Sequence, residues 1–224
     1  MIAILQCRLT SSRLPGKLLY SFFDETVLER MINIAKSAKS VSNIIVAFGG
    51  QFGSSIVNDI AQRHRVEFFD GNEQNVLSRY LSIAQKFENR YLLRLTCDNY
   101  LVQPLLIDRL YDQVLGENSA YGYISPLSHY CGEVIYSNSF LDFHRNRKMT
   151  LDDKEHVTFN FRASDQIKKT ILEPNFYGLD HSNSITLDTL ADLLLMKELE
   201  ILDSRLRNYN CLSALKSHNE RLNN

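Results

Sequence analysis

The sequence has no C-x-x-C pair, and its few cysteines lie far apart: Cys7, Cys97, Cys131 and Cys211. This spacing argues against a structural zinc site and against a disulfide scaffold, and free thiols are typical of a reducing compartment. No hydrophobic run approaches the roughly 20 residues that span a bilayer. The apolar start at Met1 reaches Arg8 too soon to be the hydrophobic segment of a signal peptide. We therefore expect a cytoplasmic protein with no membrane partner.

The sequence also lacks an excess of charge of one sign, because 25 Lys and Arg face 26 Asp and Glu, for a net charge of -1. Proteins that coat nucleic acid are usually strongly basic, so we expect no nucleic-acid partner. There is no internal repeat, no low-complexity tract and no linker rich in Pro or Ser. At 224 residues with 44% hydrophobic side chains, the chain is predicted to form one domain, 1–224, with a sizeable core.

Strand patterns alternate with helical patterns in the first half of the chain. Two apolar runs, 2–5 and 44–48, have the continuous hydrophobicity of strands buried on both faces, and the runs 66–69 and 91–96 are predicted to be the third and fourth strands. Each precedes an amphipathic helical pattern, and the first helix is predicted to begin near Thr26, which has capping-box spacing to Glu29. This order predicts an α/β fold, a Rossmann-like and mostly parallel sheet sandwiched by helices.

The second half is less regular. Residues 120–124 and 133–136 are predicted to be short strands of a small antiparallel insertion, and 152–162 and 189–222 are predicted to be helices. The runs 168–172 and 185–187 could return to the sheet. Ligands of open α/β sheets bind at the carboxyl ends of the strands. We therefore expect one shared rim for four loops: 6–17, 49–53, 70–75 and 97–103.

The loop after the first strand concentrates positive charge. Arg8, Arg13 and Lys17 fall within ten residues, together with three hydroxyls and a Pro-Gly turn. Cations, hydroxyls and backbone N–H groups are what a triphosphate requires. A Walker A loop is excluded because Ser11 and Leu18 stand where that motif needs Gly and Ser or Thr. The dinucleotide-binding fingerprint is excluded as well, because no G-x-G-x-x-G follows a strand. The alternative is a solvated basic loop.

Five sequence blocks resemble one known family in their order along the chain. They are Gln6 to Leu18, the 69–80 segment with Val76-Leu77-Ser78-Arg79-Tyr80, Arg94-Leu95-Thr96-Cys97-Asp98, Glu155-His156-Val157-Thr158, and Thr186-Leu187-Asp188-Thr189. These blocks resemble the cytidylyltransferases related to the spore-coat polysaccharide biosynthesis protein, which are relatives of the CMP-sialic acid and CMP-Kdo synthetases. The resemblance implies the nucleotide-diphospho-sugar transferase fold and nucleotide-sugar synthesis for surface polysaccharide or glycan.

The resemblance implies transfer of CMP from CTP to a small-molecule acceptor, a sugar acid or a sugar or polyol phosphate, with release of pyrophosphate. It gives the half 1–117 to the nucleotide and the half 118–224 to the acceptor. The expected nucleotide-binding residues are Gln6, Arg8, Ser11, Ser12, Arg13, Lys17, Asn75 and Arg79. Arg8, Lys17 and Asp98 are the expected catalytic residues, and Asp98 and Asp188 the expected Mg²⁺ ligands. Glu133, Glu155 and His156 are expected at the acceptor.

The residues themselves leave alternatives open. Asp98 and Asp188 each end a strand-like run, and two carboxylates beside a triphosphate suit Mg²⁺, yet both could merely cap a turn or a helix. Arg79 could form a salt bridge on its helix, and Arg94 is expected in a structural ion pair because it lies in a buried-looking strand. His156 could accept a proton, although its place in the family pattern favours acceptor binding or a structural role.

The sequence departs from the family pattern at several positions. Thr10 and Cys97 replace glycines, Asn99-Tyr100 replaces Cys-Pro, and Cys131-Gly132-Glu133-Val134 replaces an acidic stretch. A second hypothesis is therefore a non-catalytic nucleotide-binding relative with a degenerate acceptor site. Many relatives are dimers, so we expect a homodimer. The aromatic stretch from Tyr121 to Tyr130 would suit the interface or line the acceptor pocket.

Overall fold

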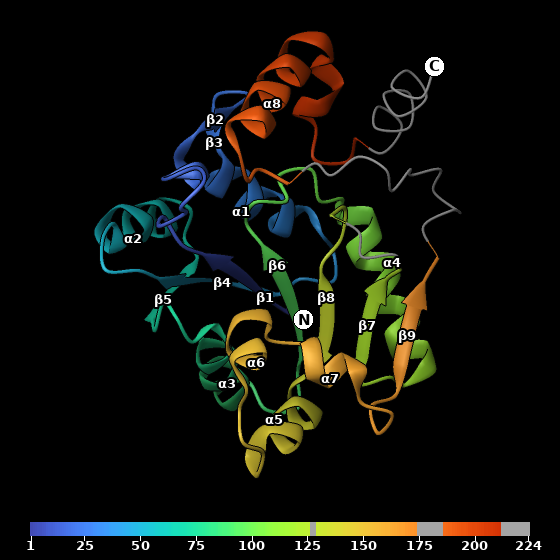
Figure 1. Cartoon of the computed structure of the whole chain (residues 1–224). Helices are drawn as coiled ribbons and strands as arrows, with labels where there is room; N and C mark the ends of the chain where they lie inside the picture. The colour runs from blue at the N-terminus through green and yellow to red at the C-terminus, as the bar shows by residue number, and fades with distance from the viewer. Residues whose placement is uncertain (126–128, 174–185, 212–224) are drawn as a thin grey trace.

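The computed structural model describes residues 1–125, 129–173 and 186–211. Its centre is a seven-stranded sheet in the order β5-β4-β1-β6-β8-β7-β9 (Figure 1). The strands are β1 (Ile2–Cys7), β4 (Asn43–Gly49), β5 (Glu67–Gly71), β6 (Tyr91–Thr96), β7 (Tyr121–Ile124), β8 (Glu133–Tyr136) and β9 (Lys169–Leu172). The four strands from β5 to β6 are parallel, β8 is antiparallel to both β6 and β7, and β9 is parallel to β7. The predicted mostly parallel sheet with a small antiparallel part is confirmed.

Helices cover both faces of this sheet. They are α1 (Val27–Ser37), α2 (Ser54–Arg63), α3 (Val76–Lys86), α4 (Pro104–Glu117), α5 (Ser137–Arg145), α6 (Leu151–His156), α7 (Phe159–Ala163) and α8 (Leu190–Leu202). Alternate residues of β1 belong to two separate cores: Ala3 and Leu5 pack with α1, α2 and α4, whereas Ile2 and Ile4 pack with α3, α5 and α7. This alternation follows from the two-residue period of a strand. No described helix has the length and apolar character that a bilayer span requires.

Local sequence signals explain several element ends. The Thr26 hydroxyl accepts a hydrogen bond from Glu29 N–H, and the Glu29 carboxylate accepts one from Thr26 N–H, which confirms the predicted capping box of α1. The same arrangement begins α8, where Thr189 pairs with Asp192.

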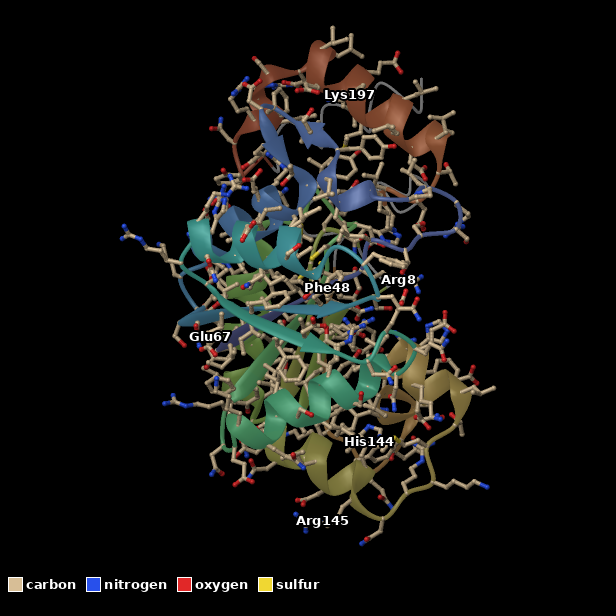
Figure 2. The ribbon with its side chains drawn as sticks, turned by 90° about the vertical axis from the view of Figure 1, so that its left-hand side faces the viewer. Arg8, Phe48, Glu67, His144, Arg145 and Lys197 are labelled. Atoms are coloured by element: carbon tan, nitrogen blue, oxygen red, sulfur yellow. The ribbon has the colours of Figure 1, made fainter. Side chains whose placement is uncertain are left out.

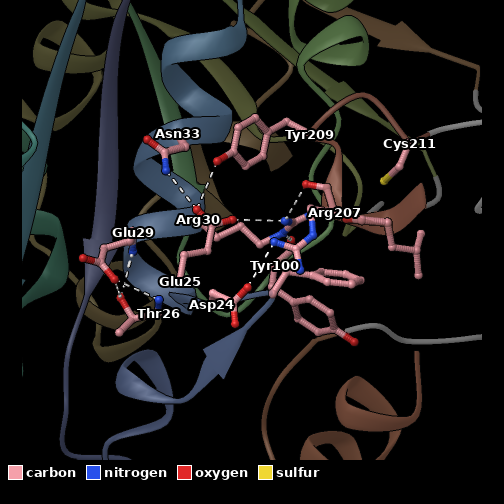
Figure 3. A network of polar contacts seen from close by, with 12 residues as sticks. Asp24, Glu25, Thr26, Glu29, Arg30, Asn33, Tyr100, Arg207, Tyr209 and Cys211 are labelled. Carbon is pink, nitrogen blue, oxygen red and sulfur yellow. Dashed lines mark hydrogen bonds and ion pairs between the residues drawn. The ribbon is translucent and has the colours of Figure 1, made fainter. Parts of the chain in front are cut away.

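A polar cluster ties distant segments together beside α1 (Figure 3). The short hairpin of β2 (Ser21–Phe22) and β3 (Glu25–Thr26) and the 3-10 turn η3 (Ser204–Arg207) were not predicted. Arg30 of α1 is fully buried and donates hydrogen bonds to the carbonyl oxygens of Tyr100 at 2.8 Å and Leu206 at 2.7 Å, and to the Glu25 carboxylate at 3.1 Å. The segment 186–211 is thereby held against the amino-terminal third of the chain.

Three predictions for the second half are wrong in the described residues. The single helix 152–162 is two short helices, α6 and α7, because Val157 takes a positive φ of 54° that no α-helix contains. The helix predicted for 189–222 ends at Leu202, and residues 212–222 of that prediction lie outside the described chain. Thr186 and Leu187 form no strand; Ile185 lies outside the described residues. Helix α5 was not predicted at all.

Candidate active site

The loop that follows β1 is shaped by its own backbone and hydroxyl groups. Gly16 has a φ of 68°, a left-handed value that favours glycine, and its N–H donates to Leu9 O at 2.9 Å. The Ser11 hydroxyl accepts from Leu14 N–H at 3.2 Å. This closed turn places Arg8 and Arg13 on the exposed side, while Lys17 is buried at the end of the loop. Figure 2 shows Arg8 on one side of the molecule, between α8 with Lys197 and α5 with His144.

Two carboxylates from distant parts of the chain meet at Lys17. Its Nζ donates to Asp98 Oδ2 at 2.8 Å and to Asp188 Oδ1 at 2.7 Å. Arg13 also pairs with Asp188, at 3.1 Å. Burial alone would raise the pKa of Asp188, but the hydrogen bond and charge of Lys17, with the charges of Arg13 and Arg8, hold that pKa below its usual value. Both carboxylates therefore lie in one positively charged environment.

The backbone explains why the two acids meet. Asp98 lies two residues beyond the end of β6, which lies next to β1 in the sheet. Leu187 N–H donates to Asp98 O at 2.9 Å, so the segment before α8 is fixed to the loop after β6. The helix cap of α8 is Thr189, so the alternative that Asp188 merely caps this helix is wrong.

A cavity of about 560 Å³ opens above this cluster. Its volume lies within the roughly 300–1,000 Å³ that small-molecule sites occupy. Seven of the eight expected nucleotide-binding residues line it: Gln6, Arg8, Ser11, Ser12, Arg13, Lys17 and Arg79. Asp98, Asp188, Glu155 and His156 line it as well. The structure thus gathers the predicted basic loop and both predicted metal ligands around one hollow.

Asn75 and Arg79 differ from expectation. Asn75 does not line this cavity, and its side-chain oxygen instead accepts from Ser78 N–H at 3.1 Å as the N-cap of α3. Arg79 forms no salt bridge within the described residues, so that alternative is wrong there. Its guanidinium is buried and donates to Ala47 O of β4 at 2.7 Å, and burial lowers the pKa of Arg79.

A second cavity of about 240 Å³ adjoins the first. The two share four lining residues: Arg94, Thr96, His129 and His156. The second cavity also contains Glu133, Thr158, Phe159 and Arg162 among its lining residues. Of the three residues expected at the acceptor, Glu133 lines this cavity, Glu155 lines the larger one, and His156 lines both.

Glu133 is already saturated by protein partners. Its carboxylate pairs with Arg94, accepts from the Tyr121 hydroxyl, and accepts from the Thr158 hydroxyl at 3.0 Å. Burial would raise the pKa of Glu133, but the charge of Arg94 and these hydrogen bonds lower it. The expected ion pair of Arg94 is confirmed, and the carboxylate of Glu133 serves to hold its neighbours in place.

The loops 49–53 and 70–75 follow neighbouring parallel strands, as predicted, but they do not line the larger cavity. They form a separate shallow hollow that includes Gln51 and Glu73. Thr10 donates a hydrogen bond to Glu73, so the residue that replaces a family glycine joins the basic loop to this neighbouring loop.

The carboxylates of the larger cavity suit the expected Mg²⁺. Asp98 and Asp188 supply two carboxylates on one cavity, and no described group of three or more His, Cys, Asp or Glu is placed to hold a metal ion. Mg²⁺ typically takes one or two carboxylates and completes its shell with phosphate oxygens and water. The residues therefore fit a Mg²⁺ ion that is bound together with a phosphorylated ligand.

Sequence reasoning missed His129 and Arg162, which line the cavities without belonging to any quoted motif. Tyr121 and Tyr130, by contrast, are buried within the chain, so neither is available to a dimer interface or to the acceptor cavity.

The chain is similar to known proteins in sequence. A family model described as "Cytidylyltransferase" matches residues 2–211. The spore coat polysaccharide biosynthesis protein SpsF of Bacillus subtilis is 30% identical over 168 residues, which cover 72% of this chain and 70% of that protein.

Solved structures share the fold. A cytidylyltransferase from Leptospira borgpetersenii superposes with a TM-score of 0.82 at 21% identity, covering 99% of this chain and 95% of that one. A CMP:2-keto-3-deoxy-manno-octonic acid synthetase complexed with CTP superposes with a TM-score of 0.69 at 13% identity, covering 89% and 98%.

Proposed function

Because the chain belongs to the cytidylyltransferase family, we propose that it transfers cytidine monophosphate from CTP to a hydroxyl of a sugar acid or of a sugar or polyol phosphate and releases pyrophosphate. The observation that carries the proposal is the convergence of Arg8, Arg13, Lys17, Asp98 and Asp188 on one cavity beside a second, smaller one. The larger cavity would hold the nucleotide and the smaller one the acceptor.

The residues divide the work of an in-line displacement. The acceptor oxygen forms a bond to the α-phosphorus of CTP, and the bond from that phosphorus to the bridging oxygen of pyrophosphate breaks. Arg8, Arg13 and Lys17 stabilise the negative charge of the departing pyrophosphate. Asp98 and Asp188 would hold Mg²⁺, which neutralises phosphate charge when bound. Arg94, fixed by Glu133, stands where the two cavities join.

We keep in the proposal a nucleotide-binding half, 1–117, and an acceptor-binding half, 118–224. Each half, however, also contributes residues to the cavity of the other. Asp188 from the second half lines the larger cavity, and Arg94, Thr96 and Asn99 from the first half line the smaller one. A product destined for surface polysaccharide is proposed from the name of the Bacillus relative. Homodimer formation is likewise proposed from family resemblance alone.

The decisive experiment measures pyrophosphate release from CTP and Mg²⁺ with a panel of sugar acids and sugar and polyol phosphates. We expect release that requires an acceptor, that is lost in Asp98→Asn, and that survives in the matched control Asp165→Asn, an exposed carboxylate that lines neither cavity. CTP binding without release across the panel would favour the non-catalytic relative. Preference for ATP, GTP or UTP would overturn the assignment of cytosine.

A further inference from the structure

We propose that His129 accepts the proton of the attacking acceptor hydroxyl, because the fold holds its imidazole with an unprotonated Nε2 at the junction of the two cavities. The inference rests on the proposed function and deepens it by naming the proton acceptor. The acceptor hydroxyl and the α-phosphorus of CTP must meet where the acceptor and nucleotide cavities adjoin. His129 is one of the four residues that line both.

A chain of hydrogen bonds fixes the tautomer of this imidazole. Asn99 Nδ2 donates to the Thr96 hydroxyl oxygen at 2.7 Å, which leaves Asn99 Oδ1 as an acceptor only. The Thr186 hydroxyl gives its single proton to Asn99 Oδ1 at 2.9 Å. Thr186 Oγ1 also lies 2.8 Å from His129 Nδ1, and with its proton spent it can only accept there. His129 Nδ1 must therefore carry the hydrogen.

The other ring nitrogen follows from this assignment. A neutral imidazole with hydrogen on Nδ1 has a lone pair on Nε2. No described residue forms a hydrogen bond with Nε2, and the half-buried side chain lines both cavities. A positioned and unprotonated imidazole nitrogen is the usual acceptor in general-base catalysis.

The other residues at the junction are less suited to the task. Arg94 has no acceptor atom, and it is paired with Glu133. The Thr96 hydroxyl is a weak base that already accepts from Asn99. His156 is exposed, and no described residue hydrogen-bonds to its ring, so nothing selects its tautomer.

The support for His129 comes from the loop that departs from the family pattern. Asn99 follows Asp98 directly, and Thr186 lies two residues before Asp188, so the same two segments carry the proposed metal ligands and the histidine support. Asn99 is one of the departures from the family pattern that raised the hypothesis of a non-catalytic relative. Its side-chain amide here accepts the hydrogen bond of Thr186 and so supports His129.

The step balances in atoms and electrons. The acceptor oxygen forms its bond to the α-phosphorus while its proton passes to His129 Nε2, and the electron pair of the broken bond leaves with pyrophosphate. The imidazolium that results keeps its Nδ1–H bonded to Thr186 and later loses the Nε2 proton to solvent.

The kinetic test compares two histidines that line the same junction. In His129→Gln we expect kcat to fall by about 10²- to 10⁴-fold with little change in the KM for CTP, as for loss of a general base, and added imidazole to restore part of the rate. In the matched variant His156→Gln we expect mainly a raised KM for the acceptor. Thr186→Val, which keeps the shape but removes the hydroxyl, should lower kcat by roughly tenfold, the usual effect of one lost hydrogen bond.

A second measurement needs no turnover. Long-range ¹H–¹⁵N spectra of the ¹⁵N-histidine-labelled protein should show His129 protonated on Nδ1 and bare on Nε2, and Thr186→Val should shift it toward the Nε2–H tautomer. An Nε2–H ring in the unaltered protein, or a kcat within threefold of normal in His129→Gln, overturns the inference while leaving the transferase proposal intact. Absence of Asp98-dependent release with every acceptor instead overturns the proposed function, and the base assignment with it.

Discussion

One ammonium group balances two carboxylates at the centre of the larger cavity. Lys17 Nζ contacts Asp98 and Asp188 at less than 3 Å, and its side chain is only 8% exposed. In Lys17→Met the two acids would face each other without that cation, and pyrophosphate would lose one stabilising charge. We expect kcat/KM for CTP to fall by about 10²- to 10³-fold, which is typical of the loss of one such group.

Lys17→Arg serves as the control for charge in pyrophosphate-release assays. It keeps the cation but replaces a compact ammonium by a planar fork, so a smaller loss is expected. Equal activity of Lys17→Met and the unaltered protein would contradict the role of this lysine.

His144 of α5 is a buried histidine with no hydrogen-bond partner for either ring nitrogen among the described residues. It is 4% exposed and packs edge-on against Phe140 and Phe143. Burial lowers the pKa of His144 to about 4. In the unfolded chain the pKa of this histidine is near 6.5. Between about pH 6.5 and pH 4 the unfolded chain therefore binds a proton at His144 that the folded chain does not bind.

The sign of the pH effect follows. The contribution of neutral His144 to stability is complete above about pH 6.5 and is lost as the pH falls toward 4, which amounts to up to about 3 kcal/mol. As the pH falls from 7 to 4, we expect the free energy of unfolding of His144→Leu to rise by that amount relative to that of the unaltered protein. Urea unfolding at a series of pH values measures this difference. His156→Gln, at an exposed histidine, should follow the unaltered protein; a parallel pH dependence in His144→Leu would refute the prediction.

At the scale of elements, Arg30 joins α1 to η3 and to the loop after β6 (Figure 3). Its replacement by Met would leave the carbonyl oxygens of Tyr100 and Leu206 without their donor and Glu25 without its cation. Breaking a buried pair of this kind typically costs about 3–5 kcal/mol. We expect a loss of that size in the free energy of unfolding, measured by urea denaturation.

The matched control for Arg30→Met is Arg205→Gln. Arg205 of η3 forms an exposed pair with Asp203 at 2.6 Å. Exposed pairs contribute about 0–1 kcal/mol. A loss of similar size in both variants would show that burial does not set the importance of Arg30.

The elements that could be predicted are those with strong periodic signals. Buried strands such as β1 and amphipathic helices such as α1 follow from side-chain pattern and capping residues. The break at Val157 could not be predicted, since a β-branched residue at positive φ is held there by tertiary packing. The basic loop and both aspartates were found from charge and motif. His129 was missed because its support comes from Asn99 and Thr186, which only the fold brings together.

At the scale of the whole molecule, the larger cavity joins residues from both ends of the chain, so its ligand should stabilise the fold. Saturation at 100 times the Kd contributes about 2.7 kcal/mol. We expect CTP with Mg²⁺ to raise the melting temperature, and EDTA to remove most of that rise because the triphosphate then faces Asp98 and Asp188 without an intervening cation. Asp165→Asn should behave as the unaltered protein. A rise that is unchanged by EDTA would contradict the proposed metal ligands.

The contact between Lys17 and Asp188 spans 171 positions of sequence. A ribosome therefore completes the basic loop long before it adds Asp188. The turn η3, to which Arg30 is hydrogen-bonded, is synthesised later still. During translation the nascent chain could already pair Lys17 with Asp98, but neither Lys17 nor Arg13 could yet meet Asp188. The growing polypeptide therefore acquires the complete site late in its synthesis. A ribosome stalled before codon 188 would carry a chain that has the basic loop and Asp98 but lacks Asp188.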